Sequence, residues 1–222
     1  MIRKLIYSAA LILLLSAGSQ AQTPFKQEVC IGGSFGMGFS SVGFTPKVKQ
    51  NMLQTYHAGI TGRWISDKNV GLQLEVNFNQ QGWDEEFEDP AYHYKRTINY
   101  IEIPFLTHIY AGNRRVRFVM NLGPKVGYAF SESTSENLEG ASPAPNTTVA
   151  QRASGIDQKF DWGICGGPGL EIRTGIGNFV VEGRYYYALG NIYSIRRGAD
   201  FAKASNQQIL VKLTYLTKLF SW

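Results

Sequence analysis

The fold is decided by the stretch Val70-Gly71-Leu72-Gln73-Leu74-Glu75-Val76-Asn77-Phe78-Asn79-Gln80. From Val70 to Phe78 every second residue is apolar, and the residues between them are glycine, amides and one carboxylate. Successive side chains of a β-strand point to opposite faces of the sheet. This alternation therefore predicts a strand with one apolar face and one polar face.

The same alternation recurs along the chain and predicts strands at 28–39, 55–65, 70–80, 92–110, 115–130, 160–173, 179–189 and 208–219. Their apolar faces hold almost no charge, whereas their polar faces combine glycines with charges of both signs. A lipid-facing band requires a clean apolar face, and a narrow lumen crowded by long polar side chains requires small residues. The pattern favours a membrane-spanning barrel over the alternative, a soluble β-barrel or sandwich.

The predicted connections alternate between long segments, at 40–53, 81–91, 131–159 and 190–206, and short ones, at 66–69, 111–114 and 174–178. Outer-membrane barrels have short periplasmic turns, long extracellular loops and aromatic girdles at both interfaces. Tyr128 and Trp162 are expected at the outer girdle, and Trp64 and Trp222 at the periplasmic one. The sequence therefore predicts an all-β protein, a transmembrane antiparallel up-and-down β-barrel of about eight strands with short periplasmic turns and long extracellular loops.

Three prolines, Pro104, Pro124 and Pro168, lie inside predicted strands. Proline cannot donate a hydrogen bond to the neighbouring strand, and a closed barrel has no free edge to accommodate it. Bulges or locally broken pairing are therefore expected at some of these positions.

The first residues carry the pattern of a secretory signal peptide. Arg3 and Lys4 precede an apolar run, and Ser19-Gln20-Ala21 offers small residues for cleavage. The sequence predicts a signal peptide over 1–21 and an outer-membrane β-barrel domain over 22–222. Arg3 and Lys4 are the only charged residues of the leader, so its removal lowers the formal net charge from +5 to +3. That excess is too small to indicate nucleic-acid binding.

The polar faces predict a candidate site inside the barrel, a network of charged lumen side chains with a structural role. Its expected members are Arg63, Glu75, Glu102, Arg117, Lys125, Asp161, Glu171, Glu182, Arg184 and Lys212. Unpaired buried charges are costly, so they are expected to pair across the lumen. The interior of an eight-stranded barrel is just filled by side chains, so a plugged barrel is expected. A proton or ion path along these charges is the functional alternative.

Other candidate sites have weaker signals. Cys30 and Cys165 are expected to be two small lumen thiols on strands that are not neighbours, with one disulfide as the alternative. The acidic segment 83–89 lacks the ligand spacing of a calcium loop and is interpreted as a solvated loop. Arg196, Arg197 and Lys203 could contact lipopolysaccharide phosphates. The sequence predicts no metal and no cofactor.

Four predicted strands carry a resemblance to a known family. It begins at Asn99-Tyr100-Ile101-Glu102-Ile103-Pro104-Phe105-Leu106, which resembles the "Y-L-E-I-P-L-L" motif of PorT-like outer-membrane β-barrel proteins of Bacteroidetes. It continues over 121–128, over 160–171 and over 182–192, where Ala188 replaces a common glycine. The resemblance covers nearly all of the mature chain and implies a barrel that tolerates the three prolines. The family is named after a component of the type IX secretion system, but no further motif here singles out that component.

These observations leave three hypotheses about function. The first is a non-enzymatic, monomeric, porin-like barrel that contacts outer-membrane lipid and lipopolysaccharide and offers its extracellular loops to protein partners. The second is an accessory component of a type IX-like secretion or other outer-membrane transport complex. The third is a lipid-modifying enzyme, which requires a histidine beside a serine. None of the three histidines, His57, His93 and His108, lies in a catalytic motif, so no enzyme activity is predicted.

Overall fold

The computed structural model describes residues 26–222 except 139, 147–148, 154 and 195–199. The predicted signal peptide lies outside these residues. Within them, the sheet consists of β1 (Glu28–Thr45), β2 (Gln50–Asn51), β3 (Leu53–Asp67), β4 (Val70–Glu85), β5 (Tyr94–Gly112), β6 (Val116–Glu136), β7 (Phe160–Arg173), β8 (Asn178–Ala188) and β9 (Lys203–Ser221). One short helix, α2 (Ala150–Ala153), lies in the connection between β6 and β7. No helix in these described ranges is long and apolar enough to cross a membrane.

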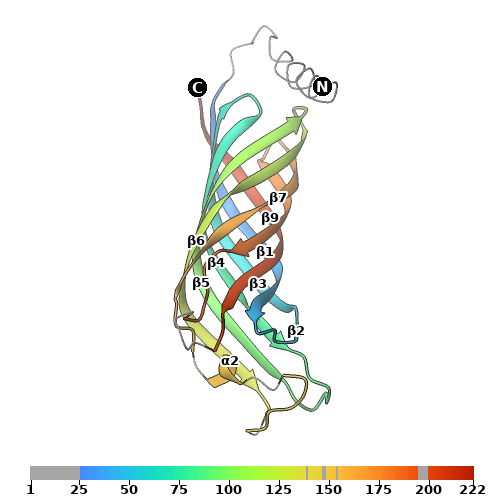
Figure 1. Cartoon of the computed structure of the whole chain (residues 1–222). Coiled ribbons are helices and arrows are strands. Elements are labelled where there is room, and N and C mark those ends of the chain that lie inside the picture. Colours follow the sequence, from blue (N-terminus) through green and yellow to red (C-terminus); the bar gives the residue numbers. More distant parts are fainter. Residues whose placement is uncertain (1–25, 139, 147–148, 154, 195–199) are drawn as a thin grey trace, which may run out of the picture.

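The long strands form a closed antiparallel barrel (Figure 1). The strands follow the order β4-β3-β1-β9-β8-β7-β6-β5, and pairing of β4 with β5 closes the ring. The two-residue β2 only extends the outer end of β4. This architecture confirms the predicted up-and-down barrel of about eight strands. We call the end with the short turns the periplasmic end and the opposite end the outer end.

The outer surface of the barrel carries the apolar face that the sequence predicted. Ile60 is 62% exposed and Leu74 is 50% exposed, and the outward residues on either side of them are also apolar. The inward neighbours of Leu74, Gln73 and Glu75, are each 1% exposed. The barrel thus turns its apolar side chains outward and its polar side chains inward, as a protein surrounded by lipid requires.

The strands β1, β3, β4, β6 and β9 continue beyond their predicted outer limits, and toward the outer end of the barrel the polarity of the two strand faces is exchanged. On β5 the outward residues change from Ile101 to Asn99 and then Lys95, and the inward residues change from Glu102 to Ile98. We call this outer part of the barrel the crown. It has a buried apolar cluster made of Val42, Phe44, Val48, Trp83, Tyr94, Ile98, Tyr100, Ala129, Leu138, Ile192, Tyr193, Phe201 and Ala204. The crown is therefore built like a water-soluble β-barrel.

The three prolines interrupt strand pairing without shifting the register. Residues 75 and 76 of β4 have no paired residue on β5, where Pro104 lies. The flanking pairs Leu74–Phe105 and Asn77–Glu102 keep the same register. Equivalent gaps in the ladder lie beside Pro124 and Pro168. The bulges lie elsewhere, for example at Asn99 and Tyr100. The expectation of locally broken pairing is confirmed.

Inward glycines make room for the lumen side chains. A Cβ at Gly36 would approach Cβ of Lys212 to 2.8 Å, and a Cβ at Gly59 would approach Oδ1 of Asn77 to 1.9 Å. Real Cβ atoms do not come so close, and packed interiors relax only partly. Glycine at these positions lets a strand of small residues face a strand of long polar ones.

Candidate functional site

The lumen holds nine of the ten predicted network residues in buried positions, between 1% and 5% exposed. These nine are Arg63, Glu75, Glu102, Lys125, Asp161, Glu171, Glu182, Arg184 and Lys212. The tenth, Arg117, is only partly buried at the periplasmic mouth. The alternation of each strand directs these side chains inward, because all of them occupy lumen-facing positions.

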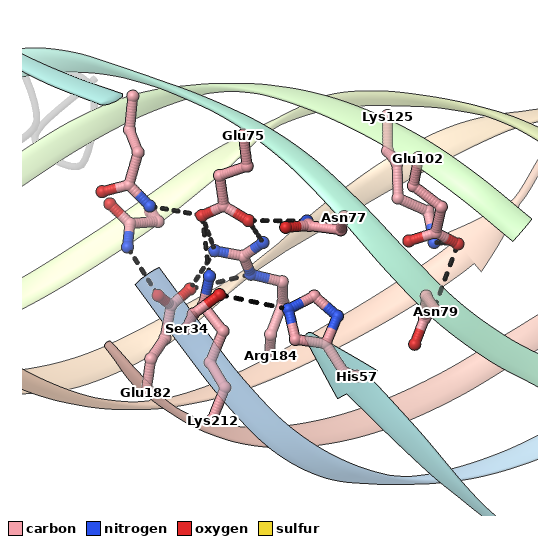
Figure 2. Close-up of polar contacts among 12 residues, drawn as sticks. Ser34, His57, Glu75, Asn77, Asn79, Glu102, Lys125, Glu182, Arg184 and Lys212 are labelled. Carbon is pink, nitrogen blue, oxygen red and sulfur yellow. Dashed lines mark hydrogen bonds and ion pairs between the residues drawn. The ribbon is translucent and has the colours of Figure 1, made fainter. Parts of the chain in front are cut away.

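The centre of the network is Glu75, which is held by two cations (Figure 2). Arg184 donates to both carboxylate oxygens of Glu75 over 2.9 Å, and Nζ of Lys212 lies 2.7 Å from Oε1. Arg184 also donates through Nε to Glu182 over 2.8 Å. Glu182 in turn accepts a hydrogen bond from Asn121 at 2.9 Å. Two carboxylates and two cations from β4, β8 and β9 therefore neutralise one another.

Amides complete the shell around Glu75. Gln73 donates to Oε1 over 2.5 Å, and Asn77 donates to Oε2 over 2.9 Å. A buried carboxylate is stable only when charge and hydrogen-bond partners replace its water shell. With these contacts the carboxylate of Glu75 is surrounded by donors.

Two further ion pairs lie on either side of this centre. Toward the outer end, Nζ of Lys125 lies 2.6 Å from Glu102, which also accepts bonds from Asn79 and Gln81. Toward the periplasmic end, Arg63 binds Glu171 at 3.0 Å and donates to Gln73 over 2.8 Å. Gln73 therefore links the Arg63 pair to the Glu75 centre.

The two remaining predicted residues have no ion-pair partner within 4 Å among the described residues. Asp161 accepts a hydrogen bond from Asn206 at 3.1 Å. Arg117 stacks on Tyr110, with the guanidinium carbon 4.3 Å from the ring centroid. The structure thus brings eight of the predicted residues into ion pairs and leaves these two in other contacts.

Apolar side chains occupy the lumen beside these charges. At the periplasmic end they are Cys30, Ile65, Tyr110, Val119, Val180 and Leu216. At the outer end the aromatic cluster of the crown lies across the barrel interior. A cavity beside His57 and Tyr186 measures only about 10 Å³, which is room for about one water molecule.

The sequence did not predict the contacts that hold the long connection of residues 137–159 over the crown. Asn146 binds Lys49 twice, accepting from its backbone N–H and donating to its carbonyl, each over 2.8 Å. Arg152 binds Glu85 at 2.7 Å, and both side chains are largely buried. Glu85 belongs to β4 and Trp83 is fully buried, so only the later part of the acidic segment 83–89 is a solvated loop.

Tyr193 links the neighbouring outer connection to the same cluster. Its hydroxyl donates to the carbonyl of Gln151 over 2.9 Å and accepts a bond from Arg96 at 2.9 Å. Burial raises the pKa of the Tyr193 phenol above its usual value, so the hydroxyl stays protonated and remains a donor. Arg196 and Arg197, considered as lipopolysaccharide contacts, lie outside the described residues.

Both cysteines and two of the three histidines, His57 and His108, are buried inside the barrel, whereas His93 is exposed in the β4–β5 connection. Cys30 and Cys165 are free and buried, as expected of two lumen thiols. Oγ of Ser34 lies 3.5 Å from Nε2 of His57, the only described Ser–His contact (Figure 2). His57 is 1% exposed and Ser34 is 8% exposed, so both side chains are shielded from solvent inside the barrel.

A family model described as an outer membrane protein beta-barrel domain matches residues 20–194. Among solved structures, the attachment invasion locus protein Ail of Yersinia pestis shares 13% identity, with 86% of this chain and 99% of that chain covered and a TM-score of 0.42. Neisserial surface protein A shares 11% identity, with 86% and 98% covered and a TM-score of 0.44. The Escherichia coli outer membrane protein W shares 13% identity, with 83% and 96% covered and a TM-score of 0.34. A comparison with curated proteins gave no match.

The structural scores are too low to carry an argument, so the assignment depends on the family model and on the barrel itself. The family model matches most of the chain, and the described strands close into a ring with an apolar outer face. The chain is an outer-membrane protein and belongs to the family of outer membrane protein β-barrel domains.

Proposed function

We propose that the mature chain, residues 22–222 after removal of a signal peptide, is a non-enzymatic, monomeric barrel whose lumen is closed. The single observation that carries this proposal is the neutralisation of the lumen charges by one another. Glu75 contacts Arg184 and Lys212, so the cations that would attract a permeating anion are already engaged. A path for ions would require these pairs to separate in a narrow interior, at a cost of several kcal/mol per ion.

The part of the barrel available for function is then its outer surface. The Asn146–Lys49 and Arg152–Glu85 contacts hold the longest outer connection against the crown. An ordered surface loses less conformational entropy on binding than a mobile one. We infer that the crown is a preorganised surface for protein partners or lipopolysaccharide.

An enzymatic role has little support from the geometry. Ser34 and His57 are buried in the lumen, and their 3.5 Å separation is at the limit of a hydrogen bond. A nucleophile and its base must be reachable by substrate. A lipid-modifying enzyme would need this pair at the membrane boundary, where the acyl chains are.

The second candidate is an accessory role in a type IX-like secretion or other transport complex. The observation that favours it is the resemblance of 99–106, 121–128, 160–171 and 182–192 to PorT-like proteins. A closed barrel with an ordered outer surface suits a subunit that binds a partner rather than one that conducts cargo.

Photo-crosslinking in intact cells tests the proposed role of the crown. A benzophenone side chain at His93, in the exposed β4–β5 connection, is expected to give one discrete adduct with a protein or with lipopolysaccharide. The matched control is Lys68, which is exposed in the short turn between β3 and β4. A stoichiometric protein adduct would favour the accessory role. No adduct at His93, or equal adducts at both positions, would contradict the proposal.

A further inference from the structure

A cavity of about 640 Å³ opens at the periplasmic mouth of the barrel. It lies between the turn that joins β5 to β6, the turn that joins β7 to β8 and the end of β9. Its lining includes Arg114, Arg117, Arg173 and Lys218, together with residues 174–178 and Thr217. No carboxylate is among the described lining residues, so the cavity concentrates positive charge.

Most of these cations lack the acidic partners that the lumen cations have. Arg173 is the exception, because it binds Glu28 at 2.8 Å and its Nε lies 3.9 Å from Glu171. Arg117 stacks on Tyr110 at 4.3 Å and makes no ion pair among the described residues. Arg114 and Lys218 are exposed, and neither has a carboxylate within 4 Å among the residues that the structure describes. Positive and negative charges are therefore paired in the lumen, whereas positive charges are in excess at the periplasmic mouth.

Hydrogen bonds fix the walls of the cavity. Thr174 donates through Oγ1 to the carbonyl of Gly177 over 2.7 Å and closes the β7–β8 turn. The hydroxyl of Tyr215 donates to the carbonyl of Ile176 over 2.5 Å. The backbone N–H of Arg173 donates to the carbonyl of Arg115 over 2.8 Å and joins the two turns. These hydrogen bonds hold the backbone of the two turns in place around the cavity.

We propose that this cavity is a binding site for a phosphate-bearing anion. Guanidinium groups bind phosphate through two parallel hydrogen bonds, and several cations around one cavity strengthen this attraction. The volume lies within the range of about 300–1,000 Å³ typical of ligand sites and exceeds that of a single phosphate. The ligand is either a phosphodiester headgroup of a lipid in the periplasmic leaflet or a soluble phosphorylated molecule. This site goes beyond the proposed role of the crown, because it lies at the opposite end.

The test uses the mature chain in nanodiscs of phosphatidylcholine and in nanodiscs of mixed phosphatidylglycerol and phosphatidylcholine. Pyrophosphate is titrated by calorimetry to probe a soluble ligand, and retention of phosphatidylglycerol over phosphatidylcholine is measured by native mass spectrometry to probe a lipid. The double variant Arg114→Gln with Lys218→Gln removes the two exposed cations. Arg115→Gln is the matched control, because Arg115 lies in the same turn but does not line the cavity.

The double variant is expected to weaken binding of at least one probe by about tenfold or more, because two charge-assisted contacts are lost. Arg115→Gln is expected to change it by less than about twofold, because the exposed Arg115 side chain is not part of the cavity lining and only its backbone bonds Arg173. Loss of pyrophosphate binding assigns a soluble ligand, and loss of lipid retention alone assigns a headgroup. Binding of neither probe, or an equal loss in Arg115→Gln, would overturn the proposal. Heat-modifiable migration on gels checks that each variant is folded.

Discussion

Among the lumen residues, Glu75 is expected to contribute most to the stability of the barrel, because its carboxylate binds Arg184 and Lys212 at the same time. Glu75→Gln leaves Lys212 buried without a carboxylate, whereas Arg184 keeps Glu182. Removing one partner of a buried ion pair costs about 3–5 kcal/mol. We expect this loss in the free energy of unfolding, measured by urea titration of the barrel in lipid.

A double variant shows whether Glu75→Gln destabilises the barrel through the unpaired charge of Lys212 or through altered packing. Glu75→Gln combined with Lys212→Met removes the unpaired cation, so the double variant should be more stable than Glu75→Gln alone. Glu136→Gln, on the exposed end of β6, should change stability by less than about 0.5 kcal/mol. Additive losses in the double variant would contradict the pairing described here.

The lipid-facing residues make a prediction that depends on depth. Leu74→Arg places a charge near the middle of the apolar band and should cost about 2–4 kcal/mol. Leu219→Arg places the same charge near the periplasmic end of β9, where it should cost about 0–1 kcal/mol. Both side chains are about half exposed, so burial by protein does not differ between them. Equal unfolding free energies for the two variants in vesicles would show that this face does not lie in lipid.

The lumen-facing side of these residues could be predicted from sequence, but their partners could not. Period-2 alternation is local, so it assigns Glu75 and Arg184 to the polar face without knowledge of the fold. Which cation meets which carboxylate depends on the tilt and stagger of a closed barrel, which bring β4 opposite β8. Arg117 illustrates this limit, because its inward position was predicted but its place at the mouth, stacked on Tyr110, was not.

Among the elements, the connection between β6 and β7 is attached to the crown through Asn146. Its side chain makes two hydrogen bonds to Lys49 and is 5% exposed, so Asn146→Ala should free this connection from the crown. Lost buried hydrogen bonds cost about 1–3 kcal/mol, and each 1.4 kcal/mol raises the open population about tenfold. We expect trypsin to cleave after Arg152 about tenfold faster or more. Asn99→Ala is the control, because Asn99 bonds Ser131 on the exposed face.

Unchanged cleavage in Asn146→Ala would show that the connection is held by other contacts. The sequence predicted a longer connection, 131–159, and none of its contacts, for two physical reasons. In the crown the apolar side chains point inward and not outward. On β1 the outward apolar pattern therefore ends at Phe39, and the inward Val42 does not continue it. The Asn146–Lys49 contact joins residues 97 positions apart, and no local pattern encodes it.

At the scale of the whole molecule, the sequence predicted the barrel because every strand has the same pattern, one apolar face and one polar face. An apolar outer face, alternating loop lengths and an even number of strands all require closure, and the pairing of β4 with β5 provides it. The exchange of faces defines the height at which the barrel leaves the membrane. This boundary lies where Ile101 gives way to Asn99 on β5 and Phe78 gives way to Gln80 on β4.

We propose that paired charges and apolar side chains close the lumen, and single-channel recording in planar bilayers measures whether ions pass through it. An eight-stranded barrel whose interior is filled by side chains has no continuous water column. The purified monomer is therefore predicted to give no steady conductance, and Asn146→Ala, which frees the outer connection, is predicted to give none either. A stable, ohmic conductance of porin size from the wild-type monomer would show that the lumen is open.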